Sequence, residues 1–242
     1  PKYAHIPLIL NPDGTKMSKR DKGAELGSYA ELGFNPEAVN NFIALLGWSP
    51  KDDSEIFSME ELIRAFDLEA VNRSPSKFDI DKCGWVNQQH LLALSPGEFA
   101  EAAKPFVTEK SLPTDGQYPR IAASIQEKVK LLSEVPKMIS FFTDPDYAFD
   151  AETVAKVKKN EAAVGLLEKL AEAFESLTDW SEAKASIGVT AKANGAKPGQ
   201  LMFPTRVALS GMSGGPDLGE ILEILGQDEC VRRVNRTISE LS

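Results

Sequence analysis

The sequence predicts a mainly α-helical protein with a short β-hairpin at its amino terminus. After about the first 17 residues, apolar side chains recur at spacings of three and four, which is the period of one helix face. Many of these segments begin with a capping residue or a capping-box spacing. Alternating strand patterns are scarce beyond the amino terminus. Together these observations favour helices through most of the chain.

The hairpin is expected at residues 6–17. An apolar run enters the turn Asn11-Pro12-Asp13-Gly14, where proline presets φ and glycine supplies a conformation that other residues avoid. A basic cluster follows at once: Lys16, Met17, Ser18, Lys19 and Arg20. Three cations within five residues, beside a hydroxyl, suit the binding of a polyphosphate, although most small basic clusters are solvated loops.

Four helices are expected to begin within the first hundred residues. Asn35 caps the first, Pro36 fits its first turn, and Gly47 is a natural stop. Two others begin with capping boxes, in which a serine and the glutamate three residues later satisfy backbone N–H groups reciprocally. The expected helices cover 36–47, a segment from 59, 79–94 and a segment from 96; the third is expected to bury Trp85, Val86 and Leu92.

More helices are expected after a loop at residues 110–119. One runs from about Arg120 through Leu132, and Pro136 begins the next. The main boundary of the second half is expected at residues 143–146, which contain a proline between two aspartates. Two further helices are expected to begin at Asn160 and Asp179, and another follows a loop at 194–200. The last apolar stripe stops at Gly226 and consists of Leu218, Ile221, Leu222 and Leu225.

Composition limits the possible functions. The 242 residues, 42% of them hydrophobic, suffice for one large core or two smaller ones. No apolar run approaches the roughly 20 residues that span a bilayer, so we expect no membrane partner. A net charge of −9 argues against indiscriminate nucleic-acid binding but permits local contact patches. Cys83 and Cys230 lack metal-ligand or redox spacing, so we expect buried thiols in a reducing cytoplasm and no metal site.

Several motifs occur in a fixed order along the chain. The pentapeptide Lys16–Arg20 resembles the KMSKS-type signature of class I aminoacyl-tRNA synthetases. Residues 1–11 look like the strand and turn before that signature in glutamyl-tRNA synthetases, and residues 40–50 are similar to their N-x-x-x-L-L-G-W-S stretch. Residues 76–79 and 85–87 resemble the S-x-K-F-D and W-x-N segments, and residues 206–218 resemble the R-x-A-L-(T/S)-G…G-P-x-L pattern of bacterial-type enzymes.

This resemblance implies the carboxyl-terminal portion of a bacterial-type glutamyl-tRNA synthetase without its catalytic Rossmann domain. The signature would be a mobile loop that engages ATP, with Mg²⁺, during adenylation, because negative charge develops on the pyrophosphate. Lys19 would contact ATP; Lys16 and Arg20 would add charge, and Ser18 a hydrogen bond. His5 and His90 do not form the His-x-Gly-His type motif that completes such a site. We therefore expect the chain alone to bind no cofactor and to be inactive.

The resemblance also implies three regions that contact tRNA. These are a signature-loop and stem-contact helical region at 1–94 and two anticodon-binding helical subdomains at 95–144 and 145–242. The partner would be tRNA-Glu, with tRNA-Gln left open, and its anticodon bases would be splayed out and read by side chains and backbone. The candidate anticodon residues are Arg206, Pro216, Leu218 and Lys128.

Each anticodon candidate has an ordinary structural alternative. Arg206 offers a planar set of donors, but a surface salt bridge fits equally. Pro216 and Leu218 also suit a turn and a helix start. Lys128 stands where the family often has arginine in an E-R-x-x-T-L-x-E segment; it keeps the charge, loses the bidentate fork and also suits a solvated helix face.

Other identities stay open at this point. A free-standing synthetase-derived module that binds RNA or protein would carry the same motifs. A glutaminyl-specific relative would usually have β-barrel anticodon domains, which the helical pattern after residue 145 disfavours. The start at Pro1, inside an expected strand, indicates a fragment whose missing catalytic domain would be a partner in the same chain. We expect a cytoplasmic monomer.

Overall fold

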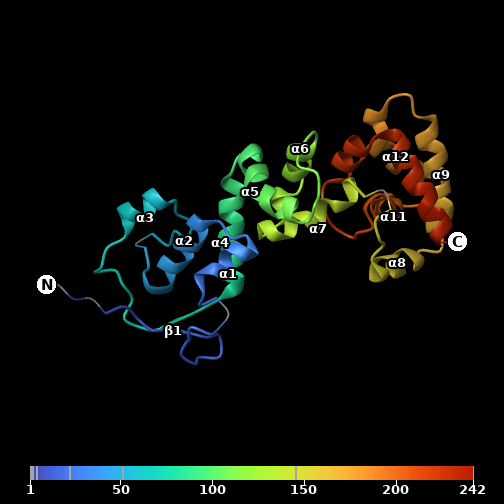
Figure 1. Cartoon of the computed structure of the whole chain (residues 1–242). Helices are drawn as coiled ribbons and strands as arrows, with labels where there is room; N and C mark the ends of the chain where they lie inside the picture. Colours follow the sequence, from blue (N-terminus) through green and yellow to red (C-terminus); the bar gives the residue numbers. More distant parts are fainter. Residues whose placement is uncertain (1–2, 4, 22, 51, 145, 242) are drawn as a thin grey trace. The chain divides into compact units, whose positions relative to one another are not determined.

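The computed structural model describes residues 3, 5–21, 23–50, 52–144 and 146–241. The chain forms two compact units, and both consist mainly of helices (Figure 1). Unit 1 contains residues 1–111 and 129–135, and unit 2 contains residues 112–128 and 136–242. The predicted mainly α fold is confirmed. The finer division at residues 94 and 144 stays a prediction, and Pro145 in the expected break lies outside the described residues.

Unit 1 combines a small sheet with five helices among its described residues. Strand β1 pairs with β2 in parallel, with Ile9 opposite Ser76 and Leu10 opposite Lys77. The expected hairpin is a single antiparallel bridge between Leu10 and Lys16, so the main partner of β1 comes from far along the chain. The elements are β1 (Ile9–Leu10), α1 (Leu26–Leu32), α2 (Pro36–Gly47), α3 (Met59–Ala65), β2 (Ser76–Lys77), α4 (Ile80–Ala93), α5 (Pro96–Glu109) and the 3₁₀ turn η2 (Leu132–Glu134).

The predicted helix starts of unit 1 are confirmed at their caps. The Asn35 side chain accepts a hydrogen bond from the Glu37 N–H at 2.8 Å. Both capping boxes form, Ser58 with Glu61 and Ser95 with Glu98. Such a cap contributes about 1 kcal/mol because it satisfies backbone donors that the first turn leaves free.

The predicted buried face of α4 is wrong at one position. Leu92 is 40% exposed, whereas Leu91 is fully buried. The buried positions of α4 instead follow spacings of three and four through Val86 and His90. Leu92 lies about 100° further round the helix than Leu91, which places it outside this stripe. Val86 is buried as expected, and Trp85 is partly buried.

A buried polar residue connects three segments of unit 1. The Asn41 side chain donates to the Glu55 carbonyl at 3.0 Å and accepts from the Phe57 N–H at 2.9 Å. Its oxygen also lies 3.0 Å from His90 Nε2. Burial lowers the pKa of His90 from its ordinary value, while Glu37 opposes that effect. His90 is therefore part of the core of unit 1.

In unit 2, all the regular elements among the described residues are helices. Helix α12 packs on α9, and α10 and α11 complete the bundle (Figure 1). Within the described ranges, no helix is both long and apolar enough to cross a membrane. The elements are α6 (Tyr118–Ala123), η1 (Gln126–Lys128), α7 (Val135–Ile139, from the unit boundary), η3 (Ser140–Phe142), α8 (Ala151–Lys158), α9 (Ala163–Ser176), η4 (Trp180–Glu182), α10 (Ala183–Ala193), α11 (Pro198–Ser210) and α12 (Leu218–Leu241).

The helix expected from Arg120 through Leu132 is wrong. Helix α6 ends at Ala123, and Leu131 is extended at φ −132° and ψ 141°. Tertiary hydrogen bonds replace the helical ones within unit 1. The Leu132 N–H donates to the Gly33 carbonyl at 3.1 Å, and Asn87 donates to the Lys130 carbonyl at 2.5 Å. Hydrogen bonds to residues far away in the sequence therefore replace the helix that the spacing of the apolar residues predicts.

Of the other helix boundaries predicted in unit 2, one is wrong and two are confirmed. Asn160 stays outside α9, which begins at Ala163, and the buried stripe uses Leu166 rather than Val164. The predicted stop at Gly226 is confirmed, because the backbone is non-helical there and the α12 range joins two helices across a kink at this glycine. At φ 75° and ψ 170°, this position requires glycine, since a Cβ would be strained there. Asp179 caps η4 as predicted, accepting from the Ser181 N–H at 3.0 Å.

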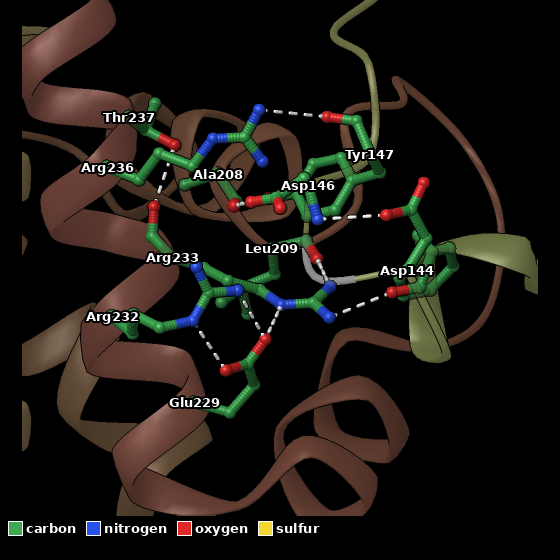
Figure 2. A network of polar contacts seen from close by, with 11 residues as sticks. Asp144, Asp146, Tyr147, Ala208, Leu209, Glu229, Arg232, Arg233, Arg236 and Thr237 are labelled. Carbon is green, nitrogen blue, oxygen red and sulfur yellow. Dashed lines mark hydrogen bonds and ion pairs between the residues drawn. The ribbon is translucent and has the colours of Figure 1, made fainter.

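A buried arginine holds the carboxyl-terminal helix to the rest of unit 2 (Figure 2). Arg233 is 1% exposed, and its Nε donates to Glu229 at 2.6 Å. Its two terminal nitrogens donate to the carbonyls of Leu209, at 2.6 Å, and Phe141, at 2.8 Å. The guanidinium also lies 4.8 Å from the centre of the Tyr147 ring. One side chain therefore satisfies acceptors from three separate segments.

Candidate functional site

The signature loop is a closed turn attached to the core of unit 1. The Asn11 N–H donates to the Thr15 carbonyl at 2.8 Å, and the Met17 N–H donates to the Ile9 carbonyl at 3.0 Å. The Met17 side chain packs, partly buried, against the hydrophobic cluster that contains Phe42 and Phe78. These contacts leave the rest of the pentapeptide facing solvent: Lys16, Ser18, Lys19 and Arg20 are exposed.

Asp21 organises the loop, and the sequence analysis did not single it out. Its carboxylate accepts from the Ser18 N–H at 2.7 Å and from the Asn11 amide at 3.0 Å. These two hydrogen bonds, the Ser18 one first, hold the pKa of Asp21 below its ordinary value. The Ser18 oxygen accepts from the Arg20 N–H at 3.3 Å, and the Ser18 side chain also contributes to lowering the pKa of Asp21. An aspartate directly after the basic cluster was the available sequence signal.

The three cations of the signature are not neutralised within the chain. Throughout the described part of the chain, no carboxylate lies within ion-pair distance of Lys16, Lys19 or Arg20. Asp21 is occupied by backbone and amide donors instead. The loop therefore presents a positive surface on a chain that carries a net charge of −9. Such a surface suits an anionic ligand with several oxygens.

In unit 2 the structure brings three of the predicted anticodon residues together. The Arg206 guanidinium, on α11, donates to the Pro216 carbonyl at 2.6 Å. It is partly buried, and burial lowers its pKa while Asp217 opposes that effect. Pro216 and Leu218 are both buried, and the Leu218 side chain belongs to the main core of unit 2. Arg206 thus fixes the loop that leads into α12.

The remaining contacts show how this loop is built. Gly211 ends α11 at φ 71°, and a Cβ there would lie 2.6 Å from the Ala148 carbonyl oxygen, so only glycine fits. Asp217 accepts from the Gly219 N–H at 2.8 Å and pairs with Lys184 at 2.8 Å. The Lys184 hydrogen bond is the main cause that lowers the pKa of Asp217. The sequence analysis missed Asp217, although Asp217 followed three residues later by Glu220 has a capping spacing.

Lys128 lies apart from this group in the sequence and in its local structure. It is exposed at the end of η1, and its backbone N–H donates to the Ile125 carbonyl at 2.8 Å. No contact of Lys128 with Arg206, Pro216 or Leu218 is present among the described residues. The predicted roles of all four residues toward an anticodon stay predictions.

Comparison with known proteins identifies the family of the larger part of the chain. A family model described as "Anticodon binding domain" matches residues 98–238, more than half of the chain. The chain belongs to the anticodon binding domain family. A second model, "tRNA synthetases class I (E and Q), catalytic domain", matches residues 1–85. The first matched range contains the motif of the α11–α12 segment, and the second contains the signature loop.

Individual relatives of this anticodon binding domain protein are similar to it along both units. A glutamate–tRNA ligase of Akkermansia muciniphila is 54% identical over 237 residues, covering 97% of this chain and 54% of the relative. A glutamate–tRNA ligase of Natranaerobius thermophilus is 34% identical, and the match covers 100% of this chain and 51% of the relative. Among solved structures, this chain is similar to a glutamate tRNA ligase from Elizabethkingia meningosepticum, crystallised in complex with its amino acid. The TM-score is 0.85 at 32% identity, and the match covers 100% of this chain and 52% of the other.

The chain spans about half the length of the curated relatives it matches. The two family matches and the similarity along the whole chain are consistent with the carboxyl-terminal portion of a glutamyl-tRNA synthetase. The family resemblance predicted from the motifs is therefore confirmed.

Proposed function

We propose that this chain is the tRNA-binding part of a glutamate–tRNA ligase, which attaches glutamate to tRNA-Glu using ATP. The observation that carries this proposal is the anticodon binding domain match over residues 98–238, within which Arg206 donates a hydrogen bond to Pro216 in the loop that leads to the buried Leu218. Arg206 reads or supports the anticodon loop from this position, and Lys128 adds charge. A cytoplasmic location and a monomeric state stay predictions.

The signature loop has a separate role in the proposal. Lys19 contacts the ATP phosphates in the complete enzyme, while Lys16 and Arg20 add positive charge and Ser18 donates a hydrogen bond. The exposure of these side chains and the absence of an ion pair for the three cations, among the residues described, support this role. When bound, ATP with Mg²⁺ supplies the activated phosphate for amino-acid adenylation. This chain's own part is to place charge beside the leaving pyrophosphate.

Titration with tRNA transcripts tests the RNA-binding part of the proposal. The chain is expected to bind tRNA-Glu more tightly than an unrelated tRNA at two salt concentrations, with weaker binding at the higher salt. Filtration or fluorescence anisotropy measures the affinity, and a tRNA-Gln arm shows whether that tRNA is also accepted. Equal affinity for all the tRNAs would contradict recognition of the anticodon.

Adenylation is expected to be absent from the isolated chain. Neither His5 nor His90 belongs to a His-x-Gly-His type motif, and His90 is buried against Asn41. Glutamate-dependent exchange of pyrophosphate into ATP is therefore expected at the background level, with a complete glutamate–tRNA ligase as the positive control. Robust exchange by the purified chain would show that the signature loop has a catalytic partner within these 242 residues.

A further inference from the structure

Unit 2 contains a long segment without acidic side chains. Residues 183–216 include four basic residues and no aspartate or glutamate, in a chain that has 36 acidic residues overall. This segment contains α11, the helix that carries Arg206. Lys184 pairs with Asp217, and Arg206 is a predicted anticodon residue, so Lys192 and Lys197 are the basic residues of the segment without an assigned role. A segment with basic and no acidic residues, in an otherwise acidic protein, is a candidate for contact with an anionic partner.

The structure joins this segment to a second basic element, the carboxyl end of α8. The Asn160 amide donates to the Gln200 carbonyl at 3.0 Å, which ties the end of α8 to the start of α11. A pocket of about 340 Å³ lies between the two elements. The end of α8 lines it with Lys156, Lys159 and Asn160, and α11 lines it with Gly199, Gln200 and Phe203.

The charge in this pocket is available to a ligand. Lys159 is exposed and has no ion pair among the residues that the structure describes. Lys156 pairs with Glu152 at 2.8 Å, but the two side chains are 51% and 78% exposed. An exposed pair of this kind contributes at most about 1 kcal/mol, so an incoming phosphate can replace Glu152. The pocket therefore offers two ammonium groups against one weakly held carboxylate.

The helix stripe that lines the pocket leads along α11 toward the predicted anticodon arginine. Gly199, Phe203 and Arg206 are spaced by four and three residues, so they lie on one stripe of the helix. Phe203 and Arg206 are about one turn apart, a rise of roughly 5 Å. Phe203 is partly buried and contributes an aromatic wall to the pocket. Lysines beside an aromatic surface are the combination that binds the phosphates and bases of single-stranded nucleic acid.

We propose that this pocket binds the RNA backbone next to the anticodon, with Lys156 and Lys159 neutralising phosphates and Phe203 contacting the adjoining nucleotide. The proposal rests on the proposed function, since it extends the RNA surface of unit 2 from Arg206 to the end of α8. A phosphate contact positions the RNA without reading its sequence. The pocket therefore contributes affinity equally for tRNAs that differ only in the anticodon.

The test compares Lys156→Gln/Lys159→Gln with a matched control, Lys158→Gln/Lys169→Gln, in the full 242-residue chain. Both double variants remove two lysine charges from unit 2, but Lys158 and Lys169 do not line the pocket. The readout is the affinity for tRNA-Glu, and for the same tRNA with an altered anticodon, across a salt series. Circular dichroism melting checks that α8 is intact, and Lys156→Arg/Lys159→Arg restores the charge at the pocket.

If each lysine neutralises one phosphate, the pocket variant is expected to bind about 25-fold more weakly at 0.1 M salt, and its salt slope is expected to fall by about 1.4. Both tRNAs should lose affinity equally, the arginine variant should bind like the wild type, and the control should change little. Equal effects of the pocket and control variants, or no effect of either, would overturn the proposal. Failure of the wild-type chain to bind tRNA would instead refute the proposed function itself, and this inference with it.

Discussion

Replacing Arg233 by alanine is expected to destabilise unit 2 by about 3–5 kcal/mol, because it leaves two buried carbonyls without their donors and opens a cavity in the core. The substitution leaves Glu229 without its buried partner and removes the donors to the Leu209 and Phe141 carbonyls. It also opens a cavity beside Tyr147 (Figure 2). Because a domain is stable by only about 5–15 kcal/mol, this loss approaches unfolding of the unit.

Arg232→Ala is the matched control. Arg232 pairs with the same carboxylate, at 2.7 Å, but its side chain is 42% exposed. Its removal is expected to cost at most about 1 kcal/mol. Hydrogen exchange of the α11 and α12 amides measures the stability of unit 2 by itself. Similar losses from the two substitutions would show that the burial of Arg233 contributes nothing beyond an ordinary surface pair.

The same network predicts that the stability of unit 2 depends on pH. The hydrogen bonds from Arg232 and the one from Arg233 lower the pKa of Glu229 from 4.5 to about 2. The unfolded chain therefore binds a proton at Glu229 before the folded chain does as the pH falls. The stabilising contribution is complete above about pH 4.5 and is lost progressively as the pH falls toward 2. In Glu229→Gln this component of the acid sensitivity of unit 2 should be missing.

Replacing Arg206 by alanine is expected to weaken binding of tRNA-Glu by about 5- to 150-fold, the equivalent of 1–3 kcal/mol for a good directional contact to a base. The loss should be smaller for a tRNA with an altered anticodon, because that RNA never made the full contact. Arg206→Lys keeps the charge but not the planar fork, so it should recover little of the discrimination. Affinity for the two tRNAs, measured side by side, is the readout.

The contact between Arg206 and the Pro216 carbonyl adds a structural outcome to this test. Loss of that hydrogen bond frees the loop before α12, so amide exchange at residues 212–218 should be measured in the same variants. Equal loss of affinity on both tRNAs, with faster exchange in the loop, would make Arg206 a support for the loop rather than a reader of the anticodon.

Short-range signals in the sequence were sufficient for much of the fold. The caps at Asn35 and Ser58 and the stop at Gly47 depend on neighbours within one helical turn, so they could be predicted locally. The order of the motifs likewise predicted the family, because short residue patterns stay recognisable without knowledge of the tertiary structure.

The tertiary structure alone decided the features that join distant segments. The partner of β1 is β2, some 66 residues later, and the Lys130 and Leu132 backbone groups pair with Asn87 and Gly33 instead of continuing a helix. An arginine at position 233 looks like any surface cation in the sequence, since only packing shows that it is buried. The pocket between α8 and α11 exists for the same reason: charge and period are local properties, whereas burial and pairing depend on where the chain returns.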